Sequence, residues 1–484
     1  MNEKKLVLQG VLWKFAERIA AQLVSVIVSI ILARLLTPDE YGMISIVTVF
    51  INIANIFATS GFGSALIQKK NADSKDYSSV FYFTLGFTAI LYIILFFLAI
   101  PISNFYNMPL LKNVIRVLGL TIPITGVNSI QHAYISRKME FKKYFKATFI
   151  GTVISAIIGI VMAYLSFGVW ALVVQSLTNS IIDTIVLQAS INWKITKEFS
   201  FDRIRILFDY GWKLLAQSFI VQVYSSLRSL LIGKIYTASD LAYYTKGNQF
   251  PDLIAMNIES AINTVLFPAM SRAQDSLATV KNMARKTTQI TSYIMSPLIV
   301  GFIVVANSFI CVLLTDKWLM AVPYLRIECI ILLFRTPQTA ILQALKAIGK
   351  SDSVLKCDIP IRVFAFVVLL VSIKFGVLYF AISEILTTLF GMLLYAFEAK
   401  KHIGYSYIEL ISDFLLNVFR ALIMGGIVWG VGLIMPFGSL TIMMLQIVLG
   451  VSIYLIISIL GCSPDFYYVL NTVKEFLITR REVE

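Results

Sequence analysis

Histidine, cysteine and charge are all scarce in this sequence. Its 484 residues include two His and four Cys, and only 14% of them are Asp, Glu, Lys or Arg. His132 and His402 both lie near the ends of expected helices, which disfavours a metal or acid–base site built on histidine. The Cys residues lie in or beside apolar segments without close spacing. This spacing argues against a disulfide framework and a zinc site, and it indicates buried, inert thiols.

Several motifs are also absent. No Gly-rich phosphate loop of the Walker type occurs, so we do not expect the chain to hydrolyse ATP. The formal net charge of +14 would suit nucleic acid, but no RNA-binding signature or long basic run accompanies it. No loop expected outside the membrane is long enough to fold as a domain, which argues against a membrane polymerase or glycosyltransferase. The sequence therefore predicts neither an enzyme nor a nucleic-acid-binding protein.

Long apolar segments are abundant instead. The hydrophobic share is 58% and the mean hydropathy is +0.82, values that indicate an all-α polytopic membrane protein. A membrane span needs about 20 mostly apolar residues, and this length predicts about 14 transmembrane helices. They are expected at residues 11–35, 41–64, 78–102, 111–135, 144–165, 168–191, 207–235, 241–267, 290–314, 320–347, 360–373, 377–397, 414–435 and 440–461.

Lysine and arginine gather in alternate loops. Because such residues accumulate on the cytoplasmic side of a membrane, loops such as 137–146 and 194–205 are expected inside, together with both termini. The opposite loops carry little positive charge beyond Lys112, Lys317 and Lys374. The expected location is the bacterial cytoplasmic membrane, crossed many times.

The first helix is repeated halfway along the chain. Trp212-Lys213 matches Trp13-Lys14 with one residue of slippage, and the segment 233–237 matches 33–37. The repeat predicts two pseudo-symmetric lobes of six helices. We expect an N-terminal lobe at residues 1–206, a second lobe at 207–400, and two additional helices with a cytoplasmic tail at 401–484.

Polar side chains recur at helical spacing within several spans. One interpretation is that they bond neighbouring helices to each other. The other is a cavity lined by cations, because intramembrane charge is costly and arginine suits phosphate oxygens. The cations expected in this cavity are Lys14, Arg18, Lys213, Arg228, Arg326 and Arg335, and its uncharged wall comprises Gln22, Asn52, Asn55, Gln217 and Asn263.

Four acidic side chains also lie within expected spans. Coupled transport of Na⁺ or H⁺ uses such carboxylates, and ion pairing with Arg or Lys is the alternative role. The residues concerned are Glu17, Asp183, Glu259 and Glu384. No other cofactor is expected.

A series of segments resembles the Wzx-type exporters of lipopolysaccharide, O-antigen, capsule and colanic acid in the MOP flippase superfamily. They are LARLLTPDEYG (32–42), GFGSALIQKK (61–70), GVWALVVQ (168–175), LIGKIYTASDLAYYTKGNQFP (231–251), FPAMSRAQD (267–275), TDKWLMAVPYL (315–325) and AIGKSDS (347–353). The resemblance implies a lobe pair similar to that of lipid II flippases and MATE antiporters. In the seventh helix this chain has Arg228 where a recurrent form of the family carries Asp.

The resemblance also implies a function. Such proteins flip undecaprenyl-diphosphate-linked oligosaccharide repeat units across the membrane by alternating access, and a cationic cavity, here assisted by Lys246, holds the diphosphate. Membrane lipids, a polysaccharide polymerase and glycosyltransferases are the implied partners. A MATE-like, cation-coupled multidrug exporter remains the first alternative. A membrane enzyme of polysaccharide assembly remains the second.

Overall fold

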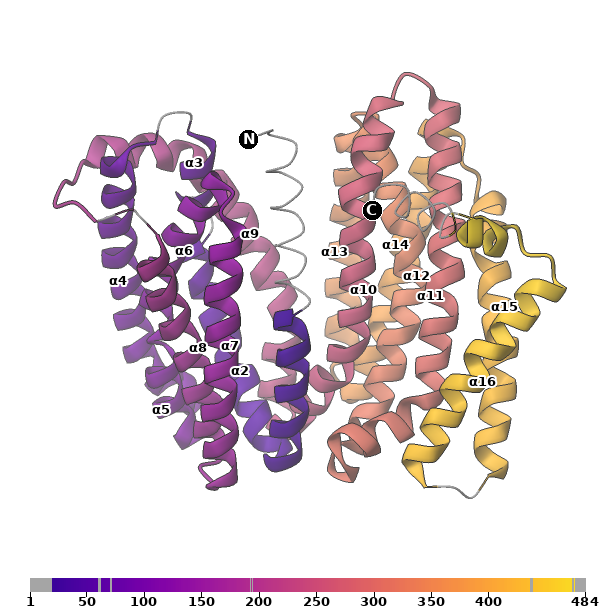
Figure 1. The fold of residues 1–484 in the computed structure, drawn as a ribbon, viewed down its shortest axis with the longest axis horizontal. Coiled ribbons are helices and arrows are strands. Elements are labelled where there is room, and N and C mark those ends of the chain that lie inside the picture. Colours follow the sequence, from indigo (N-terminus) through magenta and orange to yellow (C-terminus); the bar gives the residue numbers. More distant parts are fainter. Residues whose placement is uncertain are drawn as a thin grey trace. The chain divides into compact units, whose positions relative to one another are not determined.

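Helices account for nearly all of the computed structural model. It describes residues 20–59, 62–69, 72–191, 193, 195–435, 438–471 and 474, and none of these lies in a β-strand. The chain forms two compact units, unit 1 at residues 1–242 and unit 2 at residues 243–484. Figure 1 follows them from indigo to yellow along the sequence.

Unit 1 contains the first apolar helices. Its members are Ala20–Leu35, α2 (Pro38–Thr59), α3 (Phe62–Gln68), α4 (Ser74–Tyr106), α5 (Pro109–Leu118), α6 (Thr121–Lys138), α7 (Phe141–Tyr164), α8 (Val169–Ser190) and α9 (Phe201–Ile235). Helix α10 (Ala238–Arg272) begins in unit 1 and continues into unit 2.

Unit 2 contains the remaining helices. They are α11 (Leu277–Leu314), the 3₁₀ turn η1 (Asp316–Ala321), α12 (Val322–Ala347), α13 (Ser351–Ser372), α14 (Val377–Ile403), α15 (Tyr407–Ile434) and α16 (Ser439–Leu460). From the second onward, each expected span overlaps one described helix, except that 41–64 extends past the end of α2 into α3, 111–135 covers α5 and α6, and 320–347 begins within η1.

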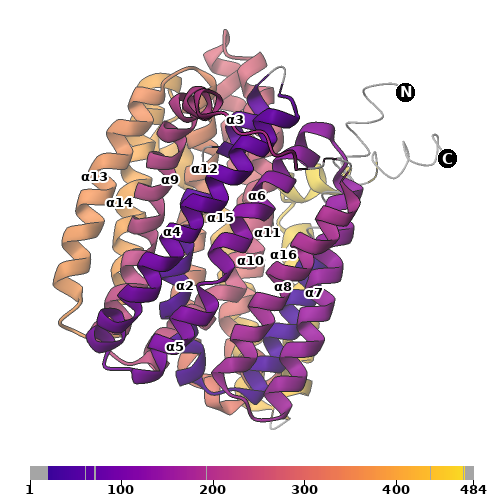
Figure 2. The ribbon, with the colours of Figure 1, turned by 90° about the vertical axis from the view of Figure 1, so that its left-hand side faces the viewer.

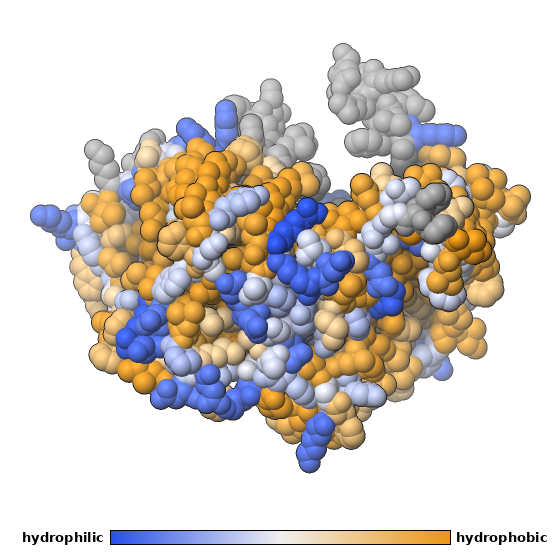
Figure 3. Space-filling view, turned by 90° about the horizontal axis from the view of Figure 1, so that it is seen from below, coloured by the Kyte–Doolittle hydropathy of each residue, from blue (hydrophilic) through white to orange (hydrophobic). Residues whose placement is uncertain are grey.

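Nine of the described helices are long and apolar enough to cross a membrane, which makes the chain a multi-pass membrane protein. Helices α9, α10, α12 and α13 are not among them, because polar residues interrupt their apolar runs. The expected span 360–373 begins too late, since α13 extends back through charged residues to Ser351. In Figure 3, hydrophobic residues cover much of the sides of the helices, and hydrophilic ones gather around the ends that face the viewer.

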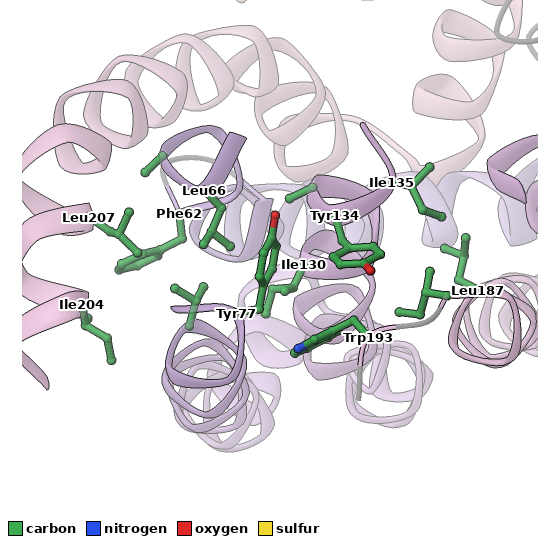
Figure 4. Packing of buried hydrophobic residues seen from close by; sticks show 14 of the residues in the cluster. Phe62, Leu66, Tyr77, Ile130, Tyr134, Ile135, Leu187, Trp193, Ile204 and Leu207 are labelled. Carbon is green, nitrogen blue, oxygen red and sulfur yellow. The ribbon is translucent and has the colours of Figure 1, made fainter. Parts of the chain in front are cut away.

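Helix α9 packs on α2, α3 and α4 and so belongs to the compact unit 1. The domain boundary expected after residue 206 is placed where the sequence repeat begins. The boundary between the compact units, after residue 242, instead reflects which helices pack together. One hydrophobic cluster of unit 1 joins α3, α4, α6, α8 and α9, and Figure 4 shows Phe62, Tyr77, Tyr134 and Trp193 within it. Apolar burial thus holds the start of α9 to the earlier helices.

The repeated sequence forms a repeated turn. The backbone N–H and hydroxyl of Thr37 donate to Glu40 Oε2 at 2.7 and 3.0 Å. The corresponding groups of Thr237, 200 positions later, donate to Asp240 Oδ2 at 3.1 and 2.7 Å. Both are reciprocal caps at a helix start, because the backbone N–H of each acidic residue bonds the threonine hydroxyl in return.

The two turns contact each other. The Ser239 hydroxyl donates to Asp39 Oδ1 at 2.6 Å. Gly42 lies so close to Ala238 that a β-carbon at position 42 would overlap the Ala238 carbonyl group. Only glycine therefore allows this approach of the α2 and α10 starts.

A buried polar network attaches α15 to α11. Arg285 donates from Nε and Nη2 to both carboxylate oxygens of Asp413, at 2.8 and 2.9 Å, and Gln289 and Tyr405 donate to the same carboxylate. Further along α15, Asn417 donates to Asp465, and Arg420 donates to Ser463. Figure 1 shows α15 and α16 beside α11, where this network lies. The two additional helices are therefore joined to unit 2 by ionic as well as apolar contacts.

Two expectations about local features need correction. The four cysteines are free, but only Cys329 and Cys357 are buried, whereas Cys462 is exposed. The amphipathic inner loop at residues 271–286 predicts an interfacial helix. It instead forms the end of α10, a short turn, and the start of α11, which is a continuous 38-residue helix.

Candidate functional site

Three carboxylates of unit 2 surround Arg335 on α12. Its Nε lies 2.9 Å from Glu259 Oε1, and its Nη atoms lie 3.8 Å from Asp252 Oδ1 and 3.9 Å from Glu328 Oε1. Asp252 and Glu259 come from α10, two turns apart on one face, and Glu328 comes from α12. We name these four residues the Arg335 cluster. The sequence places Arg335 among the cations of a predicted cavity, and the structure pairs it with three carboxylates.

Glu384 on α14 adds a fourth carboxylate nearby. It interacts electrostatically with Asp252 and Glu328 and accepts a hydrogen bond of 3.4 Å from the Tyr244 hydroxyl. Two of the residues expected to take part in ion coupling, Glu259 and Glu384, thus lie close to Arg335 in unit 2. One arginine facing several carboxylates leaves an excess of negative charge, which suits a group that gains and loses a cation.

The other expected cations of unit 2 make different contacts. Lys246 is buried and donates to Gln249 Oε1 at 3.0 Å, and Arg326 donates to the Ile303 carbonyl oxygen at 3.2 Å. Asn263 is exposed and accepts a hydrogen bond of 2.7 Å from Gln343. Their role as substrate ligands remains a prediction.

In unit 1, Arg228 and Gln217 both lie on α9, the former half-buried and the latter exposed. Asn52 and Asn55 lie on α2, and Asn55 Oδ1 is buried without a hydrogen-bond partner among the described residues. Lys14, Glu17 and Arg18 lie outside the described residues, as does the side chain of Lys213. The cationic cavity therefore stays a prediction for this part of the chain.

Asp183 is the described residue of unit 1 among those expected to take part in ion coupling, and its partners are neutral or weakly basic. Asn128 donates to its Oδ2 at 2.8 Å, His132 Nε2 lies 3.4 Å from the same oxygen, and Thr148 approaches Oδ1 at 3.5 Å. The expected alternative, pairing with Arg or Lys, does not apply to Asp183 within the described residues. A cavity of about 310 Å³ adjoins Asn128 and His132.

A larger cavity of about 460 Å³ opens between helix Ala20–Leu35, α7 and α8, which we name the unit 1 pocket. Figures 1 and 2 both show α7 and α8 side by side. The apolar residues of the lining are Ala21 and Val28, and all its other residues bear an amide or a hydroxyl. These polar residues are Gln22, Ser25, Thr152, Ser155, Gln175, Ser176 and Asn179.

Of these polar residues, only Gln22 belongs to the cavity wall predicted from the sequence. A signal for the others was present, because Gln175, Asn179 and Asp183 recur every four residues along α8, and Thr148, Thr152 and Ser155 recur at helical spacing along α7. Because the predicted cavity was assigned mainly from charged residues, it does not include these uncharged residues of α7 and α8. Among the described residues, no group of three or more His, Cys, Asp or Glu side chains could hold a metal ion.

Comparison with known proteins identifies similar sequences. The model of a family described as polysaccharide biosynthesis protein matches residues 31–323, more than half of the chain. The lipopolysaccharide biosynthesis protein WzxC of Escherichia coli (strain K12) is 23% identical, with 87% of each chain covered. The teichuronic acid biosynthesis protein TuaB of Bacillus subtilis (strain 168) is 21% identical and covers 87% of this chain and 89% of its own.

One further relative matches over a shorter length. The succinoglycan biosynthesis transport protein ExoT of Rhizobium meliloti (strain 1021) is 23% identical over 320 residues, which span 66% of this chain and 65% of that protein.

Solved structures share the fold. The lipid II flippase MurJ in an inward closed conformation superposes with a TM-score of 0.74 at 17% identity, covering 96% of this chain and 99% of that chain. An inward-facing MATE family multidrug resistance transporter of the MOP superfamily superposes with a TM-score of 0.60 at 14% identity, covering 83% of this chain and 95% of that chain. The expected fold class is confirmed.

Proposed function

The chain belongs to the polysaccharide biosynthesis protein family, and from that membership we propose that it is a flippase for lipid-linked oligosaccharides. It moves undecaprenyl-diphosphate-linked repeat units across the bacterial cytoplasmic membrane for surface polysaccharide biosynthesis. The observation that carries this proposal is the family match over residues 31–323, supported by relatives named for succinoglycan, teichuronic acid and lipopolysaccharide biosynthesis.

The mechanism we propose is alternating access, in which the lobes rock about a site near the middle of the membrane. The cations predicted from the sequence, among them Arg228, Arg326 and Lys246, would hold the diphosphate. Both termini would lie in the cytoplasm. No catalytic step is assigned to the chain, and the polymerase and glycosyltransferases that make and extend the glycan are its proposed partners.

The Arg335 cluster suits ion coupling in this scheme. Glu259 bonds Arg335 at 2.9 Å, so a proton or Na⁺ that binds Glu259 or Asp252 would compete with this arginine. Release of the cation would restore the ion pairs. The same exchange at Asp183 would alter its bonds to Asn128 and His132.

An acidic cluster would also suit a cation-coupled drug exporter, and the similarity in fold to a MATE transporter extends to this alternative. Family membership favours the flippase. Overexpression that raised resistance to cationic drugs without changing surface polysaccharide would favour the exporter.

The proposal is tested by depleting the protein in its host. We expect surface polysaccharide to be lost and lipid-linked repeat units to accumulate in the cytoplasmic leaflet. Re-expression of the chain should reverse both effects. Normal surface polysaccharide after complete depletion would contradict the proposal.

A further inference from the structure

The unit 1 pocket has the size of a ligand site and lies at mid-height of its helices. Its volume of about 460 Å³ lies within the range of about 300–1,000 Å³ for small-molecule sites. Thr152 and Ser155 lie near the middle of α7, and Gln175 and Asn179 lie in the first half of α8. Both helices are long and apolar enough to span a membrane. The pocket therefore places polar groups where substrate sites of secondary transporters lie.

The lining selects against a charged ligand. None of the described side chains of the lining is ionised, so a phosphate or an ammonium group bound among them would lack a counter-charge in a setting of low dielectric constant. Asp183, one turn beyond Asn179 on α8, is already bonded by Asn128. A neutral polar ligand fits this environment.

The amides of the pocket are available to a ligand. In the part of the chain that the structure describes, the side chains of Gln175 and Asn179 make no hydrogen bond. Thr152 and Ser155 donate to carbonyl oxygens of their own helix, Thr148 O at 2.7 Å and Thr152 O at 3.0 Å. Their hydroxyl oxygens keep lone pairs that can accept. The pocket thus offers donors and acceptors together.

Close packing of α7 and α8 fixes where the amides lie. A β-carbon at Gly151 would meet Asn179 Oδ1 at 3.1 Å, and one at Gly159 would meet Gln175 Cβ at 2.9 Å. Glycines at these positions let both side chains lie directly against α7. Both side chains therefore lie on the side of α8 that packs against α7, where Gln175 is partly exposed and Asn179 is exposed.

Neutral donors and acceptors in one site match the hydroxyl groups of a sugar, each of which both donates and accepts. We propose that the unit 1 pocket binds sugar residues of the transported glycan through Gln175 and Asn179. This inference rests on the proposed function, since it assigns the glycan part of the lipid-linked oligosaccharide to unit 1. Diphosphate recognition is left to the predicted cations.

The test measures glycan preference in binding. The full-length protein in nanodiscs is titrated with two probes, undecaprenyl-diphosphate-linked repeat unit extracted from the host and sugar-free undecaprenyl diphosphate. We expect the wild type to bind the first more tightly. Asn179→Leu and Gln175→Leu should each weaken binding of the glycosylated lipid about fivefold, with binding of the sugar-free lipid unchanged.

Thr178→Val is the matched control, because Thr178 lies next to Asn179 on α8 but outside the pocket lining. It should leave both affinities at the wild-type value. The conservative variants Gln175→Asn and Asn179→Gln keep an amide and guard against misfolding, and they should retain part of the preference. The inference would be overturned if the pocket variants kept the full preference for the glycosylated lipid. It would also be overturned if Thr178→Val lost as much affinity as the pocket variants, or if the wild type showed no preference.

The proposed function is tested separately, by the host-depletion experiment. A wild type that prefers the glycosylated lipid but does not support surface polysaccharide would refute the flippase and leave the glycan site standing. A wild type that supports export while the pocket variants bind normally would refute only the glycan site.

Discussion

Unit 1 and unit 2 differ in the chemistry of the polar groups among their helices. In unit 1 the pocket between helix Ala20–Leu35, α7 and α8 is lined by amides and hydroxyls among the described residues, and the partly exposed Asp183 on α8 is bonded by Asn128. In unit 2 the polar groups are ionic, with Arg335 facing three carboxylates and Arg285 forked onto Asp413.

The sequence repeat instead produces two similar helix-start turns, both of which lie in unit 1. Thr37 with Glu40 and Thr237 with Asp240 form the same reciprocal cap. The repeated sequence thus specifies the architecture of the turn, whereas the residues between the turns have diverged.

The largest expected effect comes from the ionic contacts of unit 2. Asp413→Asn removes the buried carboxylate that bonds Arg285 through two nitrogen atoms and leaves Arg285 with Glu409 at 3.3 Å. This change should destabilise the protein by about 3 kcal/mol. Asp183→Asn in unit 1 is the matched change, and it should cost far less because its partners are neutral or weakly basic. Thermal unfolding of both variants in detergent measures the difference, and equal losses would show that the two units do not differ in this respect.

The contact between the repeated turns comes next. Gly42→Ala places a methyl group against the Ala238 carbonyl and should cost about 1–3 kcal/mol through overpacking. Gly86→Ala is its control, since a β-carbon at Gly86 would meet nothing within 4 Å. A lower melting temperature for Gly42→Ala alone is expected. Equal melting temperatures would mean that the turns need not approach closely.

The Arg335 cluster should show its importance in transport. Arg335→Ala leaves Glu259, Asp252 and Glu328 facing one another without their cation, and we expect export to fall about tenfold or more. Adding Glu259→Gln should recover part of the loss, because it removes one of the unpaired charges. A double variant no better than the single one would show that Arg335 acts on something other than these carboxylates.

The smallest effect is expected at Asp73, the exposed N-cap residue of α4, which pairs with Arg203. Burial tends to raise the pKa of Asp73, but hydrogen bonds from the Asp76 backbone and from Arg203 outweigh it and lower that pKa. A lowered pKa in the folded state gives stability that is present above the unfolded pKa of 3.8 and is lost as the pH falls through the folded pKa. Melting temperatures below about pH 4 should therefore depend less on pH in Asp73→Asn than in the wild type. Identical pH profiles would contradict this assignment.

The spans and their order were predictable because membrane helices are read from local apolar runs. The partners of Arg335 were not, since Glu259 lies 76 residues away on another helix and the rotation of each helix is set by packing. For this reason the sequence predicts Arg335 as a cation of the cavity but not the three carboxylates that pair with it. The amides of α8 were predictable in principle from their spacing, but no pattern within one helix shows that Gly151 and Gly159 bring α7 against them.

Translocation by the purified protein tests the central claim most directly. Proteoliposomes are loaded with undecaprenyl-diphosphate-linked repeat unit, and the share that becomes accessible to a glycan-cleaving enzyme outside is followed over time. The account predicts transfer well above the level of protein-free vesicles, reduced in Asn179→Leu and in Arg335→Ala. Transfer by the folded wild type no faster than in protein-free vesicles would contradict it.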